Sequence, residues 1–120
     1  MNVHEPPQGF VTGLNARGKT EHKVGMLTSN EPGFYKVGEY GIRIENLVLV
    51  VEAEETEFGK FRAFETVTLF PMDKTLIDKP LLSQDETKWL NKYHKRVYKS
   101  LKPHLNKAEK AWLKEKCKKI

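Results

Sequence analysis

The feature that most constrains this chain is a change in the spacing of its apolar residues near position 80. Between residues 26 and 70, apolar and polar residues alternate or form short β-branched runs, which is typical of strands. After residue 83, apolar residues recur every three or four positions, which predicts an amphipathic helix. That apolar stripe consists of Leu90, Tyr93, Val97 and Leu101, with Trp89 beside it. Strands followed by helices indicate the α+β class.

The strand region divides into a few short segments. Residues 42–45 alternate apolar with polar, residues 47–51 continue as an apolar run, and residues 61–70 form a second stretch of similar length. The charged segment 52–60 between them predicts a polar connection, so we expect an antiparallel pair. The first 25 residues show no sustained periodicity and predict a loop.

The helical region carries two start signals. Ser83 with Glu86 has the spacing of a capping box, in which each side chain bonds the backbone N–H of the other residue. Pro103 ends this helix. Residues 106–109 repeat the cap pattern, and residues 111–113 give the second helix a small buried face. We therefore expect two segments. Residues 1–82 form the first, and residues 83–120 form a basic helical extension that packs on the first.

The net charge of +5 for 120 residues is unevenly distributed. Residues 1–82 carry a net charge of −3, and residues 83–120 carry +8. The aromatic residues of the basic segment fall at helix-core spacing, so we expect them to pack inward, with the lysines in solvent. We therefore expect no nucleic-acid partner.

Membrane and disulfide chemistry are also not expected. No apolar run approaches the roughly 20 residues that span a bilayer, so we expect no membrane partner. Cys117 is the single cysteine, which excludes an internal disulfide and fits a reducing, cytoplasmic compartment.

Glu31 and Glu45 are candidate metal ligands. Glu31 follows a predicted strand, and Glu45 interrupts an apolar one, where a carboxylate is costly unless it is paired or bound to a cation. Two carboxylates on adjacent strands suit a hard divalent ion such as manganese. The alternatives are that both face solvent, or that Arg43 pairs with Glu45 on the same strand face.

Histidines offer fewer candidates. His4 lies in a predicted loop, where a lone histidine is usually solvated, and His22, His94 and His104 are predicted to be at the surface. Phosphate-binding glycine loops, His-Glu-x-x-His and nucleophile elbows are absent from the sequence, which excludes several enzyme classes.

Several strings, taken in order, resemble Xaa-Pro aminopeptidases of the pita-bread metallopeptidase family. Residues 3–9 resemble the family's His-Glu-Gly-Pro loop, and residues 29–35 resemble its Glu-Pro-Gly-Tyr-Tyr segment. Residues 41–46 resemble the Gly-Ile-Arg-Ile-Glu-Asn strand, and residues 64–71 resemble Phe-Glu-Pro-Leu-Thr-Leu-x-Pro. The resemblance extends over essentially the whole chain, and it implies a partial pita-bread fold.

The resemblance implies roles for four residues. Glu31 and Glu45 match two of the five ligands of a dinuclear site that usually holds manganese, and Glu45 matches the bridging carboxylate. Glu31 and His4 match catalytic residues: Glu31 handles a proton, and His4 contacts the substrate near the scissile bond. Arg43 matches an arginine that orients the ligands.

The resemblance also implies that the remaining three ligands precede the segment that matches this chain. We therefore expect a C-terminal fragment of an enzyme that releases the residue preceding proline from Xaa-Pro peptides. The parent is expected to form a homodimer, and the isolated chain is expected to be inactive. The alternative is a catalytically dead pita-bread remnant that acts as a binding or dimerisation module.

Overall fold

A computed structural model describes residues 7–13 and 15–120. The chain divides into two compact units, Met1–Thr68 and Leu69–Ile120. We expected a boundary after residue 82, whereas the units divide after residue 68. The connector belongs with the helices because its backbone bonds to them: Tyr93 Oη donates to the Phe70 carbonyl oxygen (2.8 Å).

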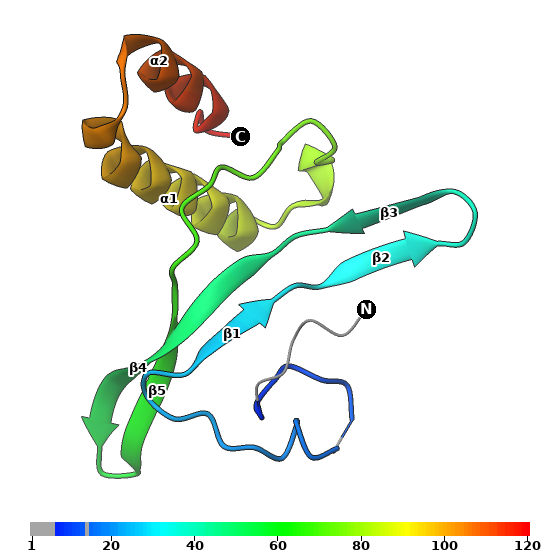
Figure 1. Cartoon of the computed structure of the whole chain (residues 1–120), viewed down its shortest axis with the longest axis vertical. Helices are drawn as coiled ribbons and strands as arrows, with labels where there is room; N and C mark the ends of the chain where they lie inside the picture. The colour runs from blue at the N-terminus through cyan, green and yellow to red at the C-terminus, as the bar shows by residue number, and fades with distance from the viewer. Residues whose placement is uncertain (1–6, 14) are drawn as a thin grey trace. The chain divides into compact units, whose positions relative to one another are not determined.

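The first unit contains all the strands (Figure 1). A three-stranded sheet has the order β1-β4-β5, and β2 and β3 form a separate two-stranded sheet; all the pairings are antiparallel. Buried Val48 and Val50 lie in the central strand. The strands are β1 (Leu27–Asn30), β2 (Gly33–Lys36), β3 (Tyr40–Arg43), β4 (Asn46–Thr56) and β5 (Gly59–Thr66).

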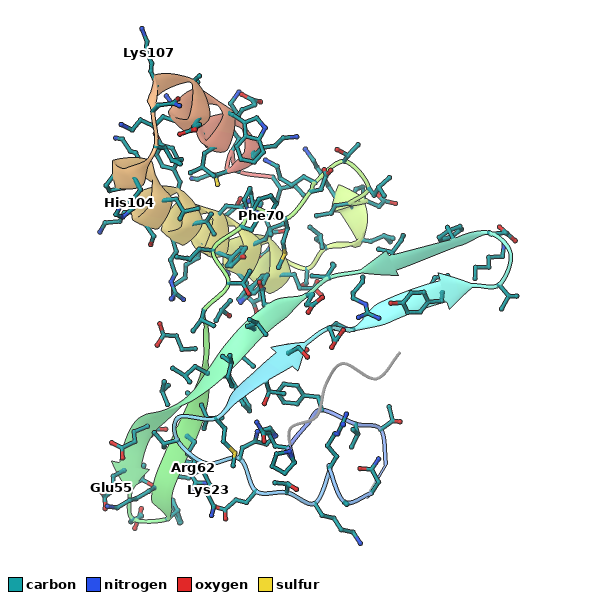
Figure 2. The ribbon with its side chains drawn as sticks, viewed as in Figure 1. Lys23, Glu55, Arg62, Phe70, His104 and Lys107 are labelled. Atoms are coloured by element: carbon teal, nitrogen blue, oxygen red, sulfur yellow. The ribbon has the colours of Figure 1, made fainter. Side chains whose placement is uncertain are left out.

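The connection between the two long strands differs from the expectation. Instead of a polar loop over residues 52–60, β4 continues to Thr56 and β5 begins at Gly59. The charged residues of segment 52–60 can remain in the strands because the hydrogen bonds of a ladder join backbone groups and not side chains. Both faces of the hairpin can therefore be exposed to solvent there. Glu55 lies at the closed end of this hairpin (Figure 2). β5 ends at Thr66, short of the predicted residue 70.

The second unit contains two α-helices and two short 3₁₀ segments. The predicted helix boundaries are confirmed: α1 (Gln84–Leu101) begins with a capping box between Ser83 and Glu86, and α2 (Lys107–Lys116) begins with one between Asn106 and Glu109. The 3₁₀ segments are η1 (Lys79–Leu81) and η2 (Lys102–His104). Figure 2 labels His104 and Lys107 at the turn between the helices.

The core of the second unit follows the predicted stripe: Leu90, Tyr93 and Val97 are buried, whereas Trp89, which was expected to pack inward, is half-exposed. Tyr93, Val97 and Leu113 form its buried cluster, and Leu101 packs against them. Trp112 is half-exposed, so the buried face of α2 is narrower than predicted.

The surface prediction for His94 is wrong. Its side chain is fully buried, and Nε2 accepts a hydrogen bond from the Met72 backbone N–H (3.1 Å). Burial and the nearby charge of Lys74 lower the pKa of His94. The histidine is therefore held neutral as a hydrogen-bond acceptor, a structural role that its spacing alone did not indicate.

His22 also differs from the surface prediction, because it is only partly exposed. Its ring stacks on Phe10, with centroids 5.4 Å apart, and meets Phe64 edge to face at 5.5 Å. His104 is exposed, as predicted.

The α+β class with antiparallel strands, expected as part of a pita-bread fold, is confirmed.

Candidate metal centre

The two candidate carboxylates lie opposite each other at a break between two strand ladders. Asn30 pairs with Asn46, and Gly33 pairs with Arg43, at the ends of the two ladders. Two residues separate these pairs on each side, so this equal spacing places Glu31 opposite Glu45 within the break between the ladders. Directly opposed residues project from the same face with their Cβ atoms about 4.5–5.5 Å apart. The fold thus brings together two carboxylates that are 14 positions apart in sequence.

Juxtaposed like charges require compensation, because two carboxylates directly opposite each other repel. Part of it comes from Arg43, which forms an ion pair with Glu31 Oε2. Ser29 Oγ donates to Glu31 Oε1 (2.7 Å). The sequence left open a pairing of Arg43 with Glu45 on the same strand face. In the structure, the ion pair of Arg43 instead reaches diagonally across to Glu31 on the neighbouring segment.

Arg43 is held by a second contact. Its Nε donates to Tyr35 Oη (2.7 Å), and its guanidinium lies 5.7 Å from the Tyr35 ring centroid. The hydrogen bond to Tyr35 and the charges of Glu31 and Glu45 raise the pKa of Arg43 above its ordinary value. The arginine therefore remains cationic and orients the Glu31 carboxylate.

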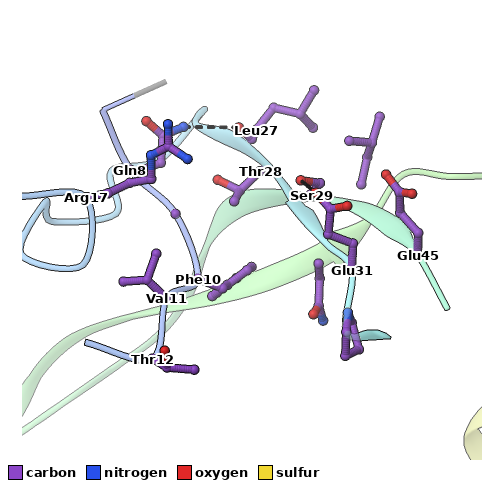
Figure 3. A pocket seen from close by; sticks show the side chains of 14 residues that line it. Gln8, Phe10, Val11, Thr12, Arg17, Leu27, Thr28, Ser29, Glu31 and Glu45 are labelled. Carbon is purple, nitrogen blue, oxygen red and sulfur yellow. Dashed lines mark hydrogen bonds between the residues drawn. The ribbon is translucent and has the colours of Figure 1, made fainter. Parts of the chain in front are cut away.

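Both carboxylates line a cavity of about 540 Å³ in the first unit (Figure 3). Apolar side chains such as Phe10 and Leu47 form part of its wall. Gln8, which is only 5% exposed, donates from Nε2 to the Leu27 carbonyl oxygen (3.1 Å). This bond fastens Gln8, near the end of the segment that resembles the His-Glu-Gly-Pro loop, to strand β1, which ends next to Glu31.

The donor chemistry fits a hard divalent cation in part. Carboxylate oxygens suit magnesium, calcium or manganese, and a carboxylate has lone pairs beyond those used by Ser29 and Arg43. Within the described residues, however, no group of three or more His, Cys, Asp or Glu side chains could hold a metal ion. Glu31 and Glu45 therefore offer part of a coordination shell. His4 lies outside the described residues.

Tyr35 and Ser29 were not singled out from the sequence. Both could have been found from the alternation of side chains along a strand, which places residues 29, 31 and 35 on the same face. The partners of Arg43 could not, because they depend on the register between strands, which this alternation does not define. Gln8 carried no signal, because a buried amide is recognised only by the contacts around it.

Two family models match this chain. A family model described as "Metallopeptidase family M24" matches residues 1–52, and another, "C-terminal region of peptidase_M24", matches residues 60–120. The chain belongs to metallopeptidase family M24. Its M24 relatives include the Probable Xaa-Pro aminopeptidase P of Coprinopsis cinerea, 45% identical over 95% of this chain and 19% of the relative. Xaa-Pro aminopeptidase 2 of Homo sapiens is 42% identical over 89% of this chain and 15% of the relative.

Part of a solved structure has the same fold as this chain. That structure is the X-prolyl aminopeptidase from Caenorhabditis elegans, described as a cytosolic enzyme with a di-nuclear active site. The match has a TM-score of 0.70 and 41% sequence identity, and it covers 82% of this chain and 17% of that chain. This M24 chain thus spans about a fifth of the length of the relatives it matches. None of its described helices is long and apolar enough to cross a bilayer.

Proposed function

We propose that this chain is the part of a metal-dependent aminopeptidase that supplies two of its metal ligands, Glu31 and Glu45. The reaction is release of the N-terminal residue from Xaa-Pro peptides. One observation supports this assignment above the others: the two carboxylates oppose each other in register and line the same cavity. The names of the M24 relatives supply the reaction class.

The cation is proposed to be manganese, two ions in the complete enzyme. Bound divalent ions would polarise the scissile carbonyl of a peptide. The residues of this chain would then have distinct tasks: Glu31 and Glu45 would hold the cations, Glu45 contributing to both, Glu31 would also accept a proton, and His4 would contact the substrate near the scissile bond.

Arg43 is proposed as a positioning residue for this site. Its ion pair fixes one oxygen of Glu31, and Tyr35 fixes the guanidinium in turn. Groups that orient metal ligands typically contribute about 10–100-fold to metal affinity or activity. Replacing Arg43 should therefore weaken metal binding although Arg43 touches no metal.

The enzyme is proposed to act in the cytoplasm as a homodimer. The cytosolic description of the Caenorhabditis elegans relative supports the location. The single cysteine fits a reducing compartment.

The ligand assignment is tested by titrating the 120-residue chain with Mn²⁺ and following the electron paramagnetic resonance signal of the free ion. We expect weak binding that E31Q and E45Q each reduce by at least about tenfold. The matched control is E39Q, because Glu39 is an exposed turn residue paired with Lys36. Equal affinity in E45Q and E39Q would overturn the assignment. Absence of Mn²⁺ binding in the unaltered chain would favour the binding-module alternative.

A further inference from the structure

A single file of lysines runs along α1 on the side opposite its buried residues. The members of this lysine file follow each other at steps of four, three, four and three residues, and every one is exposed. At 3.6 residues per turn such steps keep them on one face, over about 21 Å of helix. The lysine file consists of Lys88, Lys92, Lys95, Lys99 and its C-cap residue Lys102.

The carboxylates of the second unit do not neutralise this file. Lys88 pairs with Asp85 (3.1 Å) at the start of the helix, and from residue 87 to 108 the sequence has no acidic residue. Glu86 and Glu109 are engaged in the two capping boxes, and Glu115 pairs with Lys118. Among the described residues, no carboxylate forms an ion pair with Lys92, Lys95 or Lys99.

This arrangement works against helix stability. Like charges three or four residues apart on a helix repel, whereas Glu and Lys at the same spacing attract. A surface selected only for solubility and helix content would mix the two signs. The lysine file keeps one sign throughout, as expected when an external anion compensates it.

We propose that the lysine file binds an extended acidic polypeptide segment. A file one residue wide matches a linear polyanion better than a planar one, and carboxylates on one face of an extended chain repeat about every 6.6–6.8 Å. Lysines three and four residues apart are separated by about 4.5 and 6 Å along the helix axis. Their flexible side chains can therefore reach carboxylates at the spacing of an extended chain.

The aromatic residues of α1 argue against nucleic acid. Bases bind single-strand sites by stacking on aromatic rings. Trp89 already stacks on Tyr93, with centroids 5.5 Å apart and planes at 1°, and Lys102 Nζ lies 5.8 Å from the Tyr98 ring centroid. The lysine file itself is purely cationic, a chemistry that suits carboxylates without stacking.

The test measures binding of a fluorescent glutamate oligomer to the 120-residue chain by anisotropy at low salt. Two triple variants carry the same charge change: K92E/K95E/K99E in the lysine file and K107E/K114E/K119E at exposed positions outside it. Circular dichroism checks folding in both variants, because the first variant gains opposite-charge pairs with Lys88, Arg96 and Lys102 but also places like charges three and four residues apart.

We expect the file variant to lose at least about tenfold in affinity for the glutamate oligomer. The control variant should lose less than about threefold, because it changes only the general charge of the chain, whose effect is screened by salt. Equal losses in both variants would show binding to net charge alone and would overturn the proposal. So would tighter binding of an oligothymidylate or of anionic phosphatidylserine vesicles than of the glutamate oligomer, or no binding of the oligomer.

Discussion

At the scale of single residues, the most informative side chains are polar groups held by specific partners. Glu31 is held by Ser29 and Arg43, and His94 is held neutral by burial and by the Met72 amide. Sequence patterns identified Glu31 as a carboxylate in an awkward place. They did not identify His94, because a histidine among lysines has the same local sequence pattern whether its side chain is exposed or buried beneath the segment that precedes the helix.

His94 should make the second unit less stable as pH falls. Its pKa is lowered in the folded state, so the unfolded chain takes up the proton first as pH decreases through about 6.5. The free energy of unfolding should then fall by up to about 1.4 kcal/mol per pH unit until the folded-state pKa is reached. Urea unfolding between pH 7.5 and 5 measures this slope.

The variant H94Q is the control for that prediction. A glutamine amide oxygen can accept the Met72 N–H without titrating, so the slope between pH 7.5 and 5 should flatten. An unchanged slope in H94Q would assign the pH dependence to another group.

At the scale of elements, local signals located the helix starts well and the strand ends poorly. Capping boxes are read from residues three apart, and both predicted boxes are present. Strand ends depend on partners elsewhere in the chain: β4 extends through its acidic residues because β5 pairs with it, with a register shift between Glu52 and Glu55. A polarity pattern contains no information about that partner.

Removing the α1 cap should destabilise the second unit. In S83A the Glu86 backbone N–H loses its acceptor (3.2 Å in the structure), at a cost of about 1 kcal/mol. S100A is the matched control, because Ser100 is exposed within the same helix. Thermal unfolding followed by circular dichroism should show a lower midpoint for S83A alone; equal midpoints would mean that the box contributes nothing.

The β4–β5 hairpin should depend on Gly59. Its φ of 128° lies in the region that L residues rarely adopt, so G59A should cost about 1–3 kcal/mol. G13A is a suitable comparison, because nothing lies within 4 Å of the position of an added Cβ there and the φ of Gly13 is not positive. Urea midpoints for both variants test this, and a loss in G13A as large as that in G59A would contradict the conformational explanation.

At the scale of the whole molecule, the two units carry opposite net charges. The first unit has a net charge of −3 and holds the opposed carboxylates, and the second has +8 and carries the lysine file. Within the described residues the carboxylates do not complete a cluster of three potential metal ligands. Catalysis needs a fuller coordination shell than these two residues provide.

The purified 120-residue chain should therefore not cleave Xaa-Pro peptides, even with added Mn²⁺. An assay for release of the first residue from a tripeptide with proline in second position measures this, and E45Q serves as the background control. Turnover that E45Q abolishes would contradict the prediction, whereas turnover equal in both proteins would indicate a contaminating peptidase.

The sequence by itself determined the α+β class, the antiparallel strands, both helix starts and the resemblance to pita-bread metallopeptidases, because these depend on periodicity, caps and motif order within short segments. Only the tertiary structure decided that Glu31 faces Glu45, that Arg43 pairs with Glu31 and that His94 is buried. The physical reason is that register and burial are set by contacts between residues distant in the chain, to which local propensity is insensitive.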